Sequence, residues 1–213
     1  MRLDLHVKTA ASVEGLSTIG EILASATVRK IKGLAFADRG LMRGSNTMGD
    51  LRVIADHFGI KLFSATLIMT DYGEMIIYGL DAPESDLKVE GPKEISSLID
   101  WSHERGAAVV WSHPSKVVAE RSGPKRDGGL WSEILKGDHD WWLRKIDAIE
   151  MIWRCYRGQD GYASDLAERF GKRVVKSSGA CWVGHVGGSK GEWFSEADVA
   201  TDMDLVQWLR TRT

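Results

Sequence analysis

Short apolar runs alternate with longer amphipathic stretches along most of the chain. The apolar runs predict strands at Leu3–Leu5, Gly33–Ala37, Lys61–Met69, Glu74–Leu80, Ala107–Trp111, Ala148–Ile152 and Arg173–Lys176. The amphipathic stretches predict helices at Thr18–Lys30, Ser45–Phe58, Pro92–Arg105, Tyr162–Phe170 and Asp202–Arg210. Strands that alternate with helices favour a mainly parallel sheet, and about six or seven such units favour a barrel over an open sheet.

Local signals sharpen several of these boundaries. Thr18 and Glu21 have the spacing of a capping box at the start of the first helix. Gly59 is placed to end the second helix. The Tyr72-Gly73 pair between two apolar runs predicts a β-hairpin.

Polar residues stand at or just beyond the ends of the apolar runs, which is where barrels of this type carry their chemistry. These residues are His6, Asp38, Thr66, His113, Glu150 and Ser178. Asp4, His6 and Lys8 share one side of an extended segment, so they point either into a polar pocket or out to solvent. Taken singly, an Asp here could cap a turn and a His could be structural.

Composition is that of an ordinary globular protein. The 213 residues suit one domain spanning residues 1–213, with 43% hydrophobic residues and a formal net charge of -2. Two cysteines are too few for a disulfide framework, and the chain shows neither a signal-peptide pattern nor an apolar run of membrane-spanning length. We therefore expect a cytoplasmic protein with no membrane partner.

Six segments occur in the order and spacing of the motifs of the polymerase-and-histidinol-phosphatase (PHP) family. They are DLHVKTAASVEG from Asp4, ADRG from Ala37, SAT from Ser64, His113-Pro114, DAIEMI from Asp147 and SSGACWVGHVGG from Ser177. The chain resembles this family from residue 3 to about residue 188. The resemblance implies an α/β fold, a distorted (β/α)7-type barrel of mainly parallel strands with a β-hairpin.

The resemblance also implies a metal site, and here the sequence departs from the family. PHP enzymes hold a cluster of metal ions, often three, through His, Asp and Glu side chains. His6, Asp38 and His113 remain, with Glu14 near the Asp of the family's Asp-Gly. Other ligand positions are replaced, with Lys8 and Arg39 standing for His, Thr66 for the bridging Glu, Gly179 for Asp and Cys181 for His.

Two of these replacements work against a metal cluster. Lys8 and Arg39 offer no lone pair to a metal, and their charges would repel divalent ions in a low-dielectric pocket. We expect at most one ion, zinc or manganese, held by His6, Asp38, His113 or Cys181, with no metal as the alternative.

Three functional hypotheses follow for a PHP-like domain whose hydrolase activity is lost or much reduced. Lys8 and Arg39 could fill the pocket by forming salt bridges with Asp38, Glu14 and Glu150. The same two cations could instead bind the phosphate of a small molecule or of a nucleic-acid backbone. Residual metal-dependent phosphatase or nuclease activity is the third hypothesis. The remaining pocket residues are then Glu14, Thr66, Glu150 and Ser178, and further basic residues in predicted loops are Lys116, Lys125, Arg126, Arg154 and Arg157.

A different hypothesis is a non-catalytic protein-interaction module. Trp131, Trp141 and Trp142 lie within or just beyond the irregular stretch 114–140. If exposed, they would form a partner surface, because Trp is enriched at binding hot spots. If buried, they cover the barrel. The sequence identifies no particular protein partner.

Overall fold

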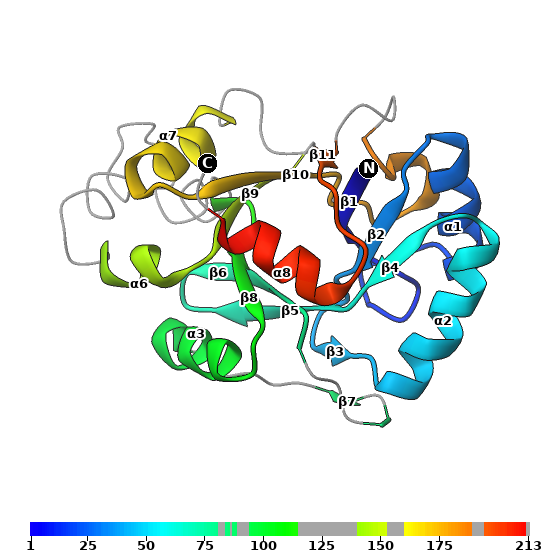
Figure 1. The fold of residues 1–213 in the computed structure, drawn as a ribbon, viewed down its shortest axis with the longest axis horizontal. Coiled ribbons are helices and arrows are strands. Elements are labelled where there is room, and N and C mark those ends of the chain that lie inside the picture. The colour runs from blue at the N-terminus through cyan, green and yellow to red at the C-terminus, as the bar shows by residue number, and fades with distance from the viewer. Residues whose placement is uncertain are drawn as a thin grey trace.

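The protein is described by a computed structural model over residues 1–80, 84–85, 87–88, 94–114, 140–152, 160–188 and 194–211 (Figure 1). Two sheets form its centre. The first has the order β11-β1-β2-β4, in which β1, β2 and β4 are parallel and β11 is antiparallel to β1. Its strands are β1 (Arg2–Val7), β2 (Gly33–Phe36), β4 (Lys61–Phe63) and β11 (Ser195–Glu196).

The second sheet has the order β10-β9-β8-β6-β5. Strands β8, β9 and β10 are parallel, and β6 runs antiparallel to both β8 and β5. Its strands are β5 (Ala65–Thr70), β6 (Gly73–Tyr78), β8 (Ala108–Trp111), β9 (Ala148–Ile152) and β10 (Arg173–Ser177). A separate antiparallel pair joins β3 (Leu41–Met42) to β7 (Leu87–Lys88).

Helices on either side of the molecule cover the outer faces of the two sheets (Figure 1). Helices α1 (Ile19–Val28) and α2 (Ser45–His57) share one apolar cluster with strands of the first sheet. Helices α3 (Ile95–Glu104), α6 (Asp140–Lys145) and α7 (Asp160–Phe170) share another with the second sheet. A short 3-10 helix, η1 (Val183–His185), follows β10.

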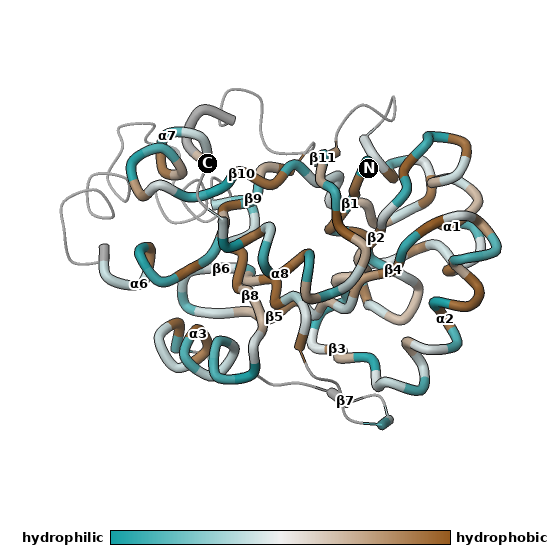
Figure 2. Tube along the Cα trace, in the orientation of Figure 1, coloured by the Kyte–Doolittle hydropathy of each residue, from teal (hydrophilic) through white to brown (hydrophobic). Residues whose placement is uncertain are grey.

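A third apolar cluster lies between the two sheets. Strands of both sheets contribute to it, and helix α8 (Asp202–Arg210) adds Leu205, Val206 and Leu209. Figure 2 shows hydrophobic and hydrophilic positions alternating along α8, as expected for a helix with one buried face. The interior between the sheets is therefore a packed apolar core, and the buried polar side chains lie toward the ends of the strands.

The two sheets approach each other at both sides without closing. An isolated parallel bridge links Val7 to Ala180, and another links Arg39 to Leu67. Within the described residues the sheets do not merge into one continuous barrel. The mixed α/β fold with parallel strands is confirmed, whereas the distorted (β/α)7-type barrel stays a prediction.

Most predicted elements are present, with one clear correction. The predicted strand Lys61–Met69 is two strands, because the chain leaves the first sheet at Phe63 and enters the second at Ala65. The hairpin is confirmed as β5 and β6. The capping box of Thr18 with Glu21 is also confirmed, since each residue hydrogen-bonds the backbone of the other.

The start of the predicted helix from Pro92 lies outside the described residues, and α3 begins at Ile95. None of the helices in the described ranges combines the length and the hydropathy that a membrane crossing requires.

Candidate active site

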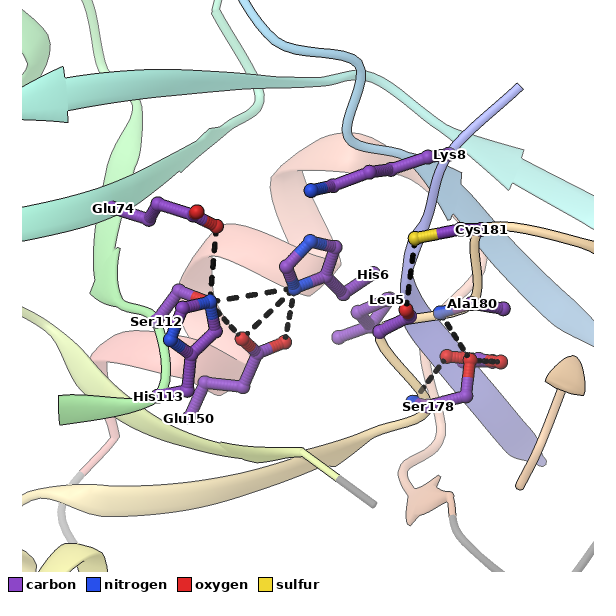
Figure 3. Close-up of polar contacts among 12 residues, drawn as sticks. Leu5, His6, Lys8, Glu74, Ser112, His113, Glu150, Ser178, Ala180 and Cys181 are labelled. Atoms are coloured by element: carbon purple, nitrogen blue, oxygen red, sulfur yellow. Dashed lines mark hydrogen bonds and ion pairs between the residues drawn. The ribbon is translucent and has the colours of Figure 1, made fainter. Parts of the chain in front are cut away.

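Two buried histidine–carboxylate pairs stand above the apolar interior (Figure 3). His6, near the end of β1, places its Nδ1 3.0 and 3.2 Å from the two carboxylate oxygens of Glu150 in β9. His113, two residues beyond β8, places its Nε2 2.9 Å from Glu74 in β6. All four residues are buried, and the two imidazole rings stack with their centroids 6.2 Å apart. Ser112 joins them through a hydrogen bond from its hydroxyl to Glu150.

The electrostatics of these pairs favour ionised carboxylates. Burial alone would raise the pKa of Glu150, but the charge of His6 and the hydrogen bond from it lower that pKa below its usual value. Burial opposes the charged form of His6, yet the Glu150 carboxylate outweighs it and raises the pKa of His6. The pKa of Glu74 is held far below its ordinary range, because the hydrogen bond and charge of His113 outweigh the effect of burial.

The pairing of β1 with β2 is irregular around His6. The register of β1 against β2 shifts between Asp4 and Val7. Such irregularities re-aim side chains and are common beside active sites. Asp4, His6 and Lys8 are all buried, so the polar trio is not an exposed strand end. Their partners nonetheless differ, since Asp4 bonds to the segment after β10, His6 bonds to Glu150, and Lys8 pairs with Glu14.

Lys8 and Arg39 converge on the carboxylate of Glu14. Lys8 forms an ion pair with one Glu14 oxygen, and the Arg39 guanidinium lies 2.5 Å from the other. Arg39 also lies 3.1 Å from Glu74, which connects this cluster to the His113 pair. Of the salt bridges that the sequence suggested as pocket filling, those of Glu14 are present. The expected partners Asp38 and Glu150 are occupied by other groups.

The Asp38 carboxylate is fully engaged by neighbouring protein groups. One carboxylate oxygen accepts a 2.7 Å hydrogen bond from the Thr9 backbone, and the other accepts a 2.8 Å bond from the Thr9 hydroxyl. The second oxygen also pairs with the buried guanidinium of Arg43. Asp38 thus ties the end of β2 to the end of β1 and to the residues after β3.

The remaining predicted site residues lie apart from the two histidine pairs. Ser178 donates to Asp4 through its backbone and its hydroxyl, at 2.9 and 2.6 Å. Cys181 is half-buried, and its thiol lies 3.7 Å from the Gly179 carbonyl. Thr66 is buried, and its hydroxyl has no hydrogen-bond partner among the described residues. Lys116, Lys125, Arg126, Arg154 and Arg157 lie outside the described residues.

The donors present do not fit the metal cluster that the PHP resemblance implies. No group of three or more His, Cys, Asp or Glu side chains in the described ranges is arranged to hold an ion. The second ring nitrogens, Nε2 of His6 and Nδ1 of His113, are buried with no hydrogen-bond partner among those residues. Figure 3 shows the Lys8 ammonium directed toward the His6 ring, so a cation stands beside one of these two donors. Asp38, bound to Thr9 and Arg43, is not free to join them.

The sequence reasoning missed Glu74, Ser112 and Arg43. Glu74 did leave a signal, because it is the only charged residue in the otherwise apolar strand GEMIIY. Ser112 precedes the flagged His113 and gave no signal of its own. Arg43 lies in the short connection between β3 and α2, where no local pattern marks it. His113 itself has a positive φ of 31°, a strained backbone that is more frequent at functional sites.

Of the tryptophans considered as a partner surface, two are described. Trp142 is fully buried and packs edge-on against Trp111, with ring centroids 4.9 Å apart. Trp141 is 45% exposed. Trp131 lies outside the described residues. A contiguous tryptophan surface is therefore not formed by Trp141 and Trp142.

A cleft of about 540 Å³ lies away from these residues, beside the start of α8. Arg52, Lys61 and Arg105 line it, and none of the predicted site residues does. Lys61 begins β4 and Gly106 precedes β8, so the cleft is at the amino-terminal ends of these strands. The histidine pairs lie at the opposite ends.

Comparisons with known proteins place the fold. No protein-family model matches the chain, and no curated protein matches it. A two-domain protein from Bacteroides vulgatus, containing a predicted PHP-like metal-dependent phosphoesterase, matches with a TM-score of 0.63 and 14% identity over 86% of this chain. The chain spans 52% of that protein's length. An amidohydrolase from Chromobacterium violaceum, solved with sulfate and no metal, matches with a TM-score of 0.65 and 14% identity over 100% of this chain and 98% of its own.

Endonuclease Q, in complex with duplex DNA that carries an abasic lesion, matches with a TM-score of 0.57 and 10% identity over 98% of this chain and 56% of its own. These likenesses define the class: the chain has the fold of the PHP-like phosphoesterases. The resemblance inferred from the six motifs is thereby confirmed at the level of the fold.

Proposed function

We propose that this chain is a non-hydrolysing PHP-fold domain that binds a phosphate-bearing ligand through Lys8 and Arg39. One observation carries the proposal, namely that these two cations converge on a single carboxylate, that of Glu14. A site built in this way stabilises an anion without a metal. An ammonium and a guanidinium are both established phosphate-binding groups, and arginine adds bidentate geometry.

The charges around the site support binding over hydrolysis. Hydrolysis in this fold would require an activated water, which metal ions commonly supply. Here Glu150 and Glu74 are each engaged by a histidine, and Asp38 is engaged by Thr9 and Arg43. No carboxylate among these is left to hold an ion or to accept a proton from water. The fold-sharing amidohydrolase with bound sulfate and no metal gives a precedent for an anion in this fold without metal.

Calorimetric titration with inorganic phosphate tests binding directly. The key variant is Arg39→Gln, because the Arg39 side chain is 40% exposed and its loss should leave the fold intact. We expect saturable binding by the unmodified chain and a loss of about tenfold or more in affinity in the variant, since one charge-assisted phosphate contact is removed. The matched control is Arg105→Gln, whose side chain is 45% exposed and lines the distant cleft.

Three results would go against the proposal. If the unmodified chain shows no saturable binding of phosphate, a phosphate-bearing ligand is ruled out. A loss of affinity in Arg105→Gln but not in Arg39→Gln moves the anion to the distant cleft. Turnover of p-nitrophenyl phosphate with added manganese that His113→Ala abolishes shows a metal-dependent hydrolase instead.

A further inference from the structure

Glu14 links a buried cation to an exposed one. The side chain of Lys8 is 8% exposed, whereas the side chains of Glu14 and Arg39 are 32% and 40% exposed. One Glu14 oxygen pairs with Lys8, and the other lies 2.5 Å from Arg39. A ligand anion that binds both cations must therefore take the position of this carboxylate.

The backbone around Glu14 is held in place, while its side chain is held mainly by the two cations. The segment between β1 and α1 is closed by the Ala10 N to Ser17 O hydrogen bond of 2.9 Å, and Leu16 N donates to Cys181 O at 2.7 Å. A Cβ at Gly15 would lie 1.8 Å from the Thr9 carbonyl oxygen, so the turn that presents Glu14 requires glycine at the next position. The preceding residue, Val13, is fully exposed. Because the Glu14 side chain is itself partly exposed, it can turn toward the solvent without entering the core.

We infer that Glu14 acts as an internal competing anion that sets an affinity threshold, which phosphomonoesters, whose terminal phosphate is a dianion, pass more readily than phosphodiesters. The inference rests on the proposed phosphate binding by Lys8 and Arg39. Glu14 then lowers the affinity of the site for every anion, and the expected ligand carries a terminal phosphate rather than a nucleic-acid backbone.

The selectivity follows from charge. A carboxylate tethered beside its partners competes at an effective concentration in the millimolar range. A phosphodiester brings one negative charge, the same as the carboxylate that it must displace. A phosphomonoester carries about -1.5 to -2 charges at pH 7 and three strong acceptor oxygens. Only the monoester therefore gains charge interaction with Lys8 and Arg39 when it replaces Glu14.

The strength of the effect depends on how fully Glu14 occupies the site. A site that is free of its internal anion about one tenth of the time binds any ligand about tenfold more weakly than an open site. Removing the charge of Glu14 should restore that factor for both ligand types. Because the internal anion lowers both affinities by the same factor, the ratio between the two affinities should stay the same.

The experiment compares methyl phosphate with dimethyl phosphate by calorimetry at pH 7.5, using the unmodified chain and Glu14→Gln. We expect the unmodified chain to prefer methyl phosphate by about tenfold or more. In Glu14→Gln, both ligands should bind about tenfold more tightly, and the ratio of their affinities should stay the same. Glu168→Gln removes an exposed carboxylate in α7 and should change neither affinity.

Two additions keep the test decisive. Glu14→Asp retains the charge but shortens the reach to two cations, so it should give intermediate affinities even if Glu14→Gln folds poorly. Lowering the pH from 7.5 to 5.5 protonates the monoester, whose second pKa is about 6, and should weaken methyl phosphate binding to the unmodified chain. Dimethyl phosphate, which stays a monoanion, should be the less affected ligand.

The outcomes separate the two proposals. Binding of methyl phosphate with the same affinity in both Glu14 variants and in the unmodified chain overturns the role of Glu14 and leaves phosphate binding standing. Failure of the unmodified chain and of every variant to bind methyl phosphate overturns the proposed function itself. Binding by Glu14→Gln alone supports the role of Glu14, since it shows a site that the internal anion keeps closed, and goes against phosphate binding by the unmodified chain.

Discussion

The pair of His6 and Glu150 makes stability depend on pH in a direction that one substitution should reverse. Both side chains are almost fully buried, and the His6 Nδ1 lies 3.0 Å from Glu150 Oε2. Removing one partner from such a pair leaves an uncompensated buried charge and typically costs about 3–5 kcal/mol. Glu150→Gln keeps the shape and a hydrogen-bond acceptor for Ser112 while it removes the charge.

The sign of the pH dependence follows from the shifted pKa of His6. The pKa is raised in the folded chain, so the folded state holds this proton more tightly than the unfolded state, whose value is near 6.5. The resulting stabilisation is complete below that unfolded value and is lost as pH rises through the folded one. In Glu150→Gln, burial without the carboxylate lowers the pKa of His6, so stability should instead fall as pH drops below about 6.5.

Urea unfolding between pH 5.5 and pH 8.5, in buffer with EDTA and without phosphate, measures both effects. We expect Glu150→Gln to lose about 3–5 kcal/mol near pH 6 and progressively less toward pH 8, where His6 can become neutral. The double variant His6→Gln with Glu150→Gln should lose this difference in slope. A destabilisation that does not change with pH, or one under about 1 kcal/mol, would refute a charged His6–Glu150 pair.

Two further predictions concern other buried contacts. Asp38→Asn should cost about 3–5 kcal/mol in urea unfolding, because it leaves the buried Arg43 guanidinium without its carboxylate, whereas Asp50→Asn on the exposed face of α2 should stay within about 0.5 kcal/mol. An Asp38→Asn variant as stable as the Asp50→Asn control would contradict the buried pair. Trp142→Ala should cost about 3–5 kcal/mol, and Trp141→Ala less than about 1 kcal/mol; equal losses would mean that Trp141 is not the exposed member of the two.

The sequence predicted the elements better than their connections. Apolar period and capping residues located α1 and α2 to within one or two residues, because local interactions decide where a helix begins and ends. The strand Lys61–Met69 was predicted without its break at Ser64, because leaving one sheet for another is decided by partner strands. The partner strands, β2 for β4 and β6 for β5, lie outside that segment, so its own sequence does not reveal the break.

The candidate site was likewise predicted only in part. Strand-end reasoning found His6, His113 and Glu150, which the structure brings together. It placed Thr66 among them as well, and the structure gives that hydroxyl no partner among the described residues. Glu74 was missed because it reaches the site from an antiparallel strand, and rules for parallel barrels consider only one end of each strand.

The replacements at the ligand positions form a coupled set because of charge balance. Carboxylates that lie close together in a low-dielectric pocket repel unless a cation compensates them. Glu14 has Lys8 and Arg39, Asp38 has Arg43, and the glutamates Glu74 and Glu150 have their histidines. Protein cations thus provide the compensation that metal ions would provide in the family's cluster.

This coupling predicts that no single reversal rebuilds a metal site. Changing Lys8 to His would add a donor but would leave Glu14 paired with Arg39 alone, and Arg39 would still place a positive charge beside Glu74. An ion entering there would meet that charge in a pocket where repulsion is strong. Lys8 and Arg39 would therefore have to be replaced together before a metal ion could bind. While both cations are present, their charges favour the binding of an anion.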